Sequence, residues 1–459
     1  MTSSPQSTPH DDALRQYLDL CDEHRATIDA HAAALLNARR AEAREALSHA
    51  KAEGPDNTAH PGISVREMLA PDYGVNISRL AFNSEPATTF RCGVPNISTL
   101  LAIVDGDTFR PTSSLLRNLP DGVTVCSLND IATSRPDLAA RYLNSLAPLT
   151  DTSTALNTLL LQDGVFIHID RSVKTDKPIQ IINIFSALQP MMATRRIVVA
   201  LEDGAAASVV VCDHSARPDV GYLSNQVVEL HLGRNAELGY YEMEESSPLT
   251  RRLNHVYARQ EEGSRLTVNS STLSCGTSLS RIEVHTAGDN TDTNLGGLAI
   301  ASGKQRIANI TDLHHSHLHG TSRQMYKYVA SDQAVASFFG IINVDERARF
   351  TNASQTNRNI LSSPEAKIYT RPQLEIYCDD VKCSHGASVG TLDAAALFYM
   401  RSRGIPQAQA RLMLMQAFMA DVIDSISLPA LSQRLHHLVE RRLSGDDMLC
   451  ADCRAADLP

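Results

Sequence analysis

The sequence predicts a mainly β protein whose core is a β-solenoid, with helical regions on both sides of it. Residues 151–393 contain many short β-branched segments separated by Gly, Asp and Asn, a pattern typical of strands joined by tight turns. Gly204, Gly233 and Gly263 recur at intervals of 29 and 30 positions, and each is followed by another apolar strand. A turn glycine at a near-constant interval indicates coils that stack on one another. A β-sandwich also has short strands, but a single sandwich of this length would be unusually large.

Residues 1–150 are predicted to form a helical and mixed N-terminal region. The part from Asp11 to Glu53 is rich in Ala, Leu, Arg and Glu, which are good helix formers, and Gly54 to Asn57 ends it. Further along, Asp121 to Leu128 predicts a turn followed by a strand. Pro136 to Leu146 predicts another helix.

Residues 151–393 are predicted to form the β-helix core, and residues 394–459 a C-terminal helical region with a flexible tail. The clearest strands of the core are Gly164–Ile169, Ile179–Phe185 and Arg196–Leu201. After the core we expect a helix that stops at Gly404, a second that begins near Pro406 and a third that begins near Pro429. The second helix has an apolar, methionine-rich face made of Leu412, Met415, Met419, Val422, Ile423 and Ile426. This face fits either core packing against the end of the solenoid or a docking surface for a partner.

Composition argues against several functional classes. The net charge of -10 without a basic tract argues against nucleic-acid binding. The polar N-terminus does not resemble a secretory signal, and no apolar run approaches the roughly 20 residues of a membrane-spanning helix. Nine scattered cysteines fit a reducing cytosol, so we expect a cytoplasmic protein. The sequence has no phosphate-loop motif, so the chain is not expected to hydrolyse ATP itself.

The main candidate site is Cys383 with His385. On an extended strand, residues two apart share a face, so the two side chains should project together. A thiolate and an imidazole suit iron, zinc or an iron–sulfur cluster, or they can act as an activated nucleophile and its base. The alternative is a purely structural role, with a buried cysteine beside a histidine that is hydrogen-bonded at a turn. Two ligands are too few for a closed metal site, so a metal here would need donors from another chain or another coil.

A second candidate is the histidine run from Asp312 to His319. If this segment is a strand, His315, His317 and His319 lie on one face in steps of about 7 Å. They could then bind zinc or ferrous iron if the strand bends, or they form a polar ladder with no metal.

Other cysteines and acids near these motifs carry weaker signals. Cys378 is either an additional ligand or a small packed residue. Asp379 and Asp380 point to opposite faces of a strand, which disfavours joint acid–base work, and one of them is expected to be a turn or ladder partner. Cys450 and Cys453 have the spacing of half a zinc site or of a redox pair, but no second half lies nearby in the sequence.

The stretch Asp379-Asp-Val-Lys-Cys-Ser-His-Gly resembles the signature near the C-terminal end of the SufB/SufD family, and within that family the SufD type. The resemblance is dense from Gln324 to Ser425 and weaker from Asp121 to Pro178. It implies a right-handed parallel β-helix and a place in the cytosolic complex that assembles iron–sulfur clusters.

The resemblance also implies a non-catalytic subunit with two partners. It would pair with SufB through the β-helices and with the ATP-hydrolysing SufC subunit through the C-terminal helical region; a homodimer without these partners is also open. No permanently bound cofactor is expected. A transient cluster, or iron, is expected at the SufB interface, where the histidine of the motif corresponds to His385 and Cys383 is its neighbour. Two rivals remain open: a SufB-like scaffold that carries its own cluster, and a stand-alone β-helix enzyme, for instance one acting on polysaccharide.

Overall fold

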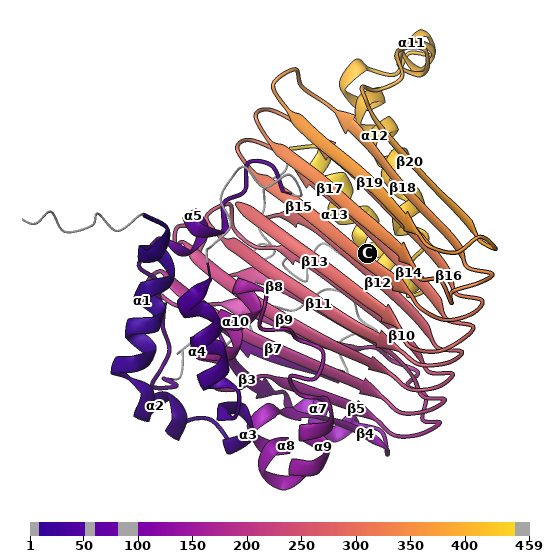
Figure 1. Ribbon diagram of the computed structural model, residues 1–459. Helices are drawn as coiled ribbons and strands as arrows, with labels where there is room; N and C mark the ends of the chain where they lie inside the picture. Colours follow the sequence, from indigo (N-terminus) through magenta and orange to yellow (C-terminus); the bar gives the residue numbers. More distant parts are fainter. Residues whose placement is uncertain (1–8, 51–59, 81–99, 446–459) are drawn as a thin grey trace, which may run out of the picture.

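The computed structural model describes residues 9–50, 60–80 and 100–445, and its core is a stack of strands arranged in two 10-stranded sheets (Figure 1). Sheet A contains β1 (Gly74–Val75), β4 (Val123–Ser127), β5 (Val165–Ile169), β7 (Met191–Leu201), β9 (Tyr222–Leu232), β11 (Arg251–Gln260), β13 (Thr277–Thr286), β15 (Arg306–His315), β17 (Val335–Val344) and β19 (Lys367–Ile376). Sheet B contains β2 (Leu101–Asp105), β3 (Thr108–Pro111), β6 (Ile179–Phe185), β8 (Ala206–Ser215), β10 (Glu237–Glu245), β12 (Arg265–Ser274), β14 (Asp292–Ala301), β16 (Thr321–Ala330), β18 (Asn352–Leu361) and β20 (Lys382–Gly390).

Successive strands alternate between the two sheets from β5 onward. Odd-numbered strands join sheet A, even-numbered strands join sheet B, and each pairs in parallel with the equivalent strands of the coils above and below. A chain that visits two sheets in turn and always returns in the same direction is a parallel β-solenoid. The predicted mainly β class and the predicted β-helix are therefore confirmed.

The turn glycines behave as the sequence interval suggested. Gly204 and Gly263 have φ angles of +71° and +67°, a region that side chains other than glycine's rarely adopt. Gly233 is needed for a different reason, because a Cβ atom there would lie 2.8 Å from the backbone nitrogen of Asp203 in the neighbouring coil. Coils can thus stack closely at this edge of the solenoid.

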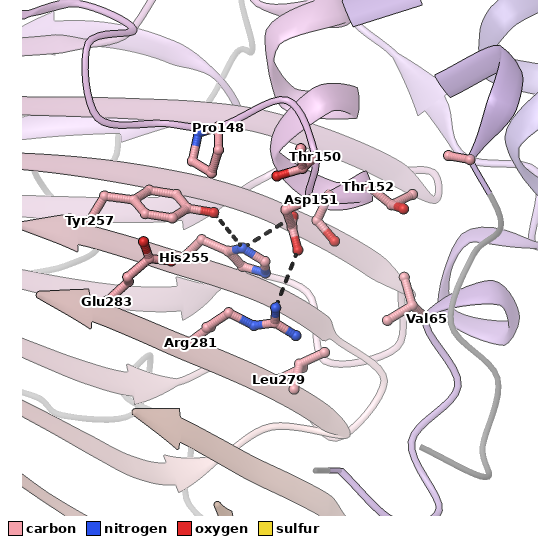
Figure 2. Close-up of a pocket in the computed structure, with 12 residues that line it drawn as sticks. Val65, Pro148, Thr150, Asp151, Thr152, His255, Tyr257, Leu279, Arg281 and Glu283 are labelled. Carbon is pink, nitrogen blue, oxygen red and sulfur yellow. Dashed lines mark hydrogen bonds and ion pairs between the residues drawn. The ribbon is translucent and has the colours of Figure 1, made fainter. Parts of the chain in front are cut away.

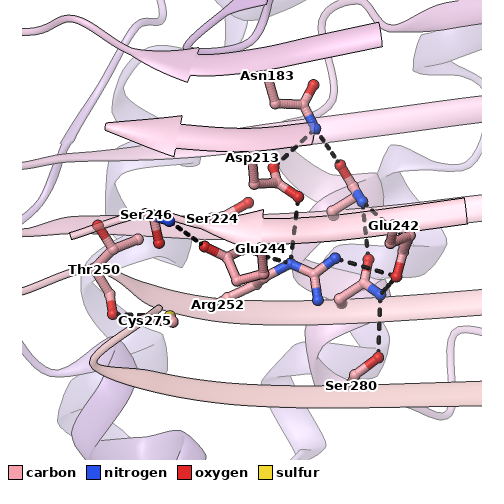
Figure 3. Close-up of polar contacts among 12 residues, drawn as sticks. Asn183, Asp213, Ser224, Glu242, Glu244, Ser246, Thr250, Arg252, Cys275 and Ser280 are labelled. Atoms are coloured by element: carbon pink, nitrogen blue, oxygen red, sulfur yellow. Dashed lines mark hydrogen bonds and ion pairs between the residues drawn. The ribbon is translucent and has the colours of Figure 1, made fainter. Parts of the chain in front are cut away.

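Charged and polar residues interrupt the apolar interior of the solenoid. Arg252 on β11 lies 3.1 Å from Glu244 and 3.3 Å from Glu242, both on β10, and 3.6 Å from Asp213 on β8 (Figure 3). All four side chains are buried. Burial, reinforced by the charge of Asp213, raises the pKa of Glu244 to about 8, so this carboxyl is mostly neutral at pH 7. Asp213 also pairs with buried Arg195 of β7 at 3.1 Å, so two arginines face the two ionised carboxylates of Asp213 and Glu242. The cluster therefore links sheet A to sheet B with its charges balanced.

Most of the N-terminal helices cover part of the outer face of sheet A. They are α1 (Pro9–Glu23), α2 (Arg25–Ala30), α3 (Ala34–Asn37), α4 (Arg40–His49), α5 (Val65–Leu69), α8 (Leu128–Ser134), α9 (Pro136–Tyr142) and α10 (Thr152–Leu160). Helix α7 (Ser113–Asn118) instead packs Leu115 into the interior cluster of the solenoid. Leu14, Leu47 and Leu156 pack in one apolar cluster with Leu223 and Leu253 of the sheet. Helix is confirmed for the N-terminal segment, although it is divided among four helices; the expected stop at residues 54–57 lies outside the described residues.

The C-terminal helices are α11 (Ala394–Ser402), α12 (Gln407–Ile423) and α13 (Pro429–Leu443). Helices α12 and α13 lie on the outer face of sheet B. Met415, Met419 and Val422 are buried in one cluster with Val210 and Leu298 of the sheet. The methionine-rich face is therefore core, and its interpretation as a docking surface is wrong; it packs on the side of the solenoid rather than on its end. No helix within the described residues is long and apolar enough to span a bilayer.

The two ends of the solenoid differ. At the N-terminal end, β3 and β4 pair antiparallel with β2 and β5 and interrupt the repeat. At the C-terminal end, β19 and β20 each have a strand neighbour on one side only, as far as the described residues show. Helix α11 projects beyond this end (Figure 1) and has no buried residue. The chain thus presents a strand edge from each sheet at its C-terminal end.

Candidate functional site

Strand β20 carries both members of the main candidate pair. Each of its residues is aligned with one on β18, so that Cys383 lies beside Ala353 and His385 beside Gln355. Ala353 and Gln355 are buried in the solenoid interior. Since aligned residues of adjacent strands point the same way, Cys383 and His385 share the inner face, as the spacing predicted. No further coil covers this face within the described residues, and His385 is exposed.

Cys383 and His385 differ in their surroundings. The Cys383 side chain is half-buried against the apolar cluster of Ile342, Val344 and Ala353. Burial raises the pKa of the Cys383 thiol above its usual value, so in the isolated chain this cysteine is a protonated thiol. This does not fit an activated nucleophile. Cys378 is half-buried against the same cluster, which supports the interpretation of Cys378 as a packed residue.

The space around His385 is open. A Cβ atom added at Gly386 would meet no atom within 4 Å, so the fold of this chain does not itself require a glycine there. Among the residues that the structure describes, no group of three or more His, Cys, Asp or Glu side chains is arranged to hold a metal ion. Cys383 and His385 are therefore two donors at a surface, without further ligands in the described part of the chain.

Backbone geometry makes β20 suitable for pairing with another strand. The amide of Lys382 donates to the Thr351 carbonyl at 2.8 Å, which directs this residue toward β18. Because successive residues of a strand alternate their hydrogen-bonding side, the amides of Cys383, His385 and Ala387 face the free edge. They form a row of donors that no strand of the described ranges pairs with.

The edge of β19 is different. The amide of Lys367 donates to the Ala334 carbonyl at 3.0 Å, so the same alternation directs residue 372 to the free edge. That residue is Pro372, which has no amide hydrogen. Proline on an edge strand is a common protection against strand addition. The free edge of β20 therefore has an uninterrupted row of amide donors, whereas the free edge of β19 lacks one at Pro372.

The loop before β20 is held by Asp380. Its carboxylate accepts two hydrogen bonds from Arg349, the shorter 2.6 Å, and its carbonyl accepts a bond from the Phe350 amide at 2.6 Å. Asp380 thus stabilises a turn, as predicted for one of the two adjacent aspartates.

The histidine run does not form the predicted ladder. Strand β15 ends at His315, and the chain then turns, so the expectation that His315, His317 and His319 share one face of a strand is wrong. His315 is buried, and its Nε2 lies 2.9 Å from the Ser322 hydroxyl. Burial, with a smaller effect of neighbouring His314, lowers the pKa of His315 to about 4, so the ring is neutral at pH 7.

The other two histidines have separate roles. His317 Nδ1 lies 3.2 Å from the Thr286 carbonyl, and His319 has a φ angle of +57° and stacks on Phe350 at 4.8 Å between ring centroids. Each ring is used to fix the turn. The accessory metal role therefore gains no support, and Cys450 and Cys453 lie outside the described residues.

One cavity, of about 330 Å³, lies where the N-terminal region meets sheet A and was not predicted (Figure 2). Within it, Asp151 lies 3.2 Å from His255 and 3.7 Å from Arg281, and accepts a hydrogen bond from the Thr154 amide at 2.8 Å. Burial raises the pKa of Asp151, but His255 and Arg281 outweigh it and hold the pKa below its usual value. The ionised Asp151 thus caps α10 and ties it to two strands. No local motif links these residues, which only the stacking of coils brings together.

Comparisons with known proteins agree with this architecture. Residues 11–181 match the family model of the SufBD protein N-terminal region, and residues 184–418 match that of the SufBD core domain of SUF-system FeS cluster assembly. A Synechocystis protein described as an iron–sulfur cluster assembly SufBD family protein is 29% identical over 73% of this chain and 76% of its own length. Iron–sulfur cluster assembly protein SufD of Escherichia coli is 30% identical over 63% of this chain and 69% of its own. SufD of Bacillus subtilis is 24% identical over 80% and 87%.

Proposed function

The chain belongs to the SufBD family of iron–sulfur cluster assembly proteins, and from this membership we propose that it is a SufD-type subunit of a cytoplasmic scaffold formed with SufB and SufC. The observation that carries the proposal is the uncovered end of the solenoid, where two donors and a free strand edge lie together. In this proposal the subunit contributes an interface and catalyses no reaction by itself.

The SufB partner would add a strand to β20. The amides of Cys383, His385 and Ala387 then gain acceptors, and the inner face of the last coil becomes covered. Gly386, which the fold of this chain leaves unconstrained, lets a second backbone approach closely. Pairing thus places donors of SufB next to Cys383 and His385.

Iron and sulfide are substrates of such a site rather than a resident cofactor. Imidazole and thiolate are suitable ligands for iron, and the partner would supply the remaining ones. The Cys383 thiol must lose its proton to bind a metal, and its raised pKa makes this step costly until the metal arrives. The isolated subunit should therefore bind iron weakly.

The SufC partner would bind the projecting part of the C-terminal region. On α11, Phe398 and Tyr399 are 72% and 59% exposed, a large apolar area for a helix without buried residues. Helix α12 is fixed to β16 through Lys327, which is buried and pairs with Asp421 while donating to the Phe418 carbonyl at 2.7 Å. A movement imposed by SufC on α12 would therefore reach the solenoid, which offers a route by which ATP binding opens the interface.

The proposal is tested by producing the chain together with SufB and SufC, followed by size measurement and anaerobic cluster reconstitution. We expect the three chains to copurify, and the His385→Ala variant to copurify equally well but to assemble little cluster. The matched control is His31→Ala, an exposed histidine among the N-terminal helices. Normal cluster assembly by the complex that carries His385→Ala would refute the role of this residue. If the parent chain copurifies with neither SufB nor SufC, the subunit proposal is refuted.

A further inference from the structure

A second concave site lies on one edge of the solenoid, apart from β20. It is a cavity of about 580 Å³ where the end of α9 meets the turns that follow β5, β7, β9 and β11. Four arginines from different coils and from the helix line it: Arg141, Arg171, Arg234 and Arg259. Their separation in the sequence is large, and only the stacking of coils gathers them.

The cavity is more positive than the rest of the chain. Three carboxylates, those of Glu202, Asp203 and Glu261, line it together with the four arginines, which leaves one positive charge in excess. The whole chain carries a net charge of -10. A local cationic excess on an acidic protein is an attractive site for an anion.

The ion pairs inside the cavity are weak. Arg141 lies 3.5 Å from Glu202, Arg171 lies 3.4 Å from Asp203 and Arg259 lies 3.0 Å from Glu261. The three arginine side chains are 65%, 71% and 52% exposed. Exposed pairs of this kind contribute little and exchange readily for a better acceptor. Within the described parts of the chain, the Arg234 guanidinium has no ion-pair partner.

Two aromatic rings, those of His231 and Tyr142, also line the cavity. His231 and Tyr142 lie with ring centroids 5.0 Å apart, and His231 Nε2 donates to the Tyr142 carbonyl at 3.1 Å. Burial lowers the pKa of His231, so the ring is neutral at pH 7 and adds no charge to the arginines. The cavity thus combines four guanidinium groups with two aromatic rings that carry no charge at pH 7.

We propose that this cavity binds a phosphate-bearing small molecule. The planar fork of a guanidinium matches two phosphate oxygens, and phosphate offers more charge than the carboxylates it would displace. The volume lies in the range of small-molecule sites and exceeds the size of a single phosphate ion, so the ligand carries at least a diphosphate or an additional organic group. This site is independent of the proposed pairing at β20.

The test uses the full chain without partners and titration calorimetry at low salt, with inorganic phosphate, pyrophosphate and ADP as probes. We expect pyrophosphate to bind, more tightly than inorganic phosphate and more weakly as salt is added. The Arg234→Gln variant should bind it about tenfold more weakly, since a charge-assisted hydrogen-bonded contact is lost. The matched control is Arg217→Gln, an exposed arginine outside the cavity that pairs with Asp219.

The three probes separate the sources of the ligand. Tighter binding of ADP than of pyrophosphate would support a nucleotide, and the opposite order an inorganic diphosphate; both support the site. Failure of all three probes to bind would overturn it, as would an equal loss in Arg217→Gln and Arg234→Gln. If Arg234→Gln lowers the melting temperature, Arg259→Gln on β11 takes its place, and unchanged pyrophosphate binding by that variant overturns the proposal.

Discussion

A proline at Ala387 should separate partner binding from folding. In this chain the Ala387 amide faces the free edge of β20, so its loss breaks no hydrogen bond of the solenoid. Residue 386 is glycine, which tolerates the conformation imposed by a following proline. The thermal stability of Ala387→Pro should therefore stay close to that of the parent chain.

The substitution Ala387→Pro should instead weaken the binding of SufB. A SufB strand added to β20 would no longer find the amide donor of residue 387. The carbonyl of SufB that would have accepted this hydrogen bond would be buried without a partner, which costs about 1–3 kcal/mol. Each 1.4 kcal/mol is tenfold in affinity, so SufB binding should weaken by about 5-fold to 150-fold before any clash of the proline ring is counted. Ala387→Ser, which keeps the amide, should bind normally.

The assay is surface-immobilised binding of SufB to each variant, with thermal unfolding measured in parallel. The opposite-facing variant Ser388→Pro removes an amide directed toward β18 and should lower stability instead. Unimpaired SufB binding by Ala387→Pro would refute strand addition at this edge.

Two further predictions concern the interior and the helices. The pKa of Glu244 is raised to about 8, so the unfolded chain releases this proton at a lower pH than the folded chain does. The contribution of protonated Glu244 to the free energy of unfolding is therefore complete below pH 4.5. It falls by at most about 1.4 kcal/mol per pH unit as the pH rises toward 8. Glu244→Gln has no such proton to lose. Urea unfolding should therefore show the free energy of unfolding of the variant rising relative to that of the parent chain between pH 5 and pH 8. Parallel pH profiles of the two proteins would contradict the raised pKa of Glu244. Phe398→Ser should abolish copurification with SufC without reducing the melting temperature. The control is Leu188→Ser, a similarly exposed residue in a loop, which should copurify with SufC normally. Equal SufC binding by both variants would exclude α11 as the contact.

Much of the architecture could be predicted because it depends on local signals that repeat. Gly204, Gly233 and Gly263 mark one turn of each coil, and Pro429 marks the start of a helix. The placement of Cys383 and His385 on one face followed from the two-residue period of a strand. These features are encoded within a few neighbouring residues.

The features that were missed depend on the stacking of coils. His317 and His319 look like a continuation of β15, but the strand ends where the turns of the adjacent coils lie. Arg252 and Glu242 are charged residues that a pattern of alternating polarity would place outside, and their burial is compensated by partners on the opposite sheet, each other included. The arginine-lined cavity likewise has no signature in any single segment.

In the proposed complex, a strand of SufB completes the last coil at β20. Amide hydrogen exchange of this chain, alone and in complex with SufB, tests it most directly. We expect the amides of Cys383, His385 and Ala387 to exchange fast in the free chain and slowly in the complex, while buried amides of β18 stay slow in both. A stable complex in which the three β20 amides still exchange fast would contradict it.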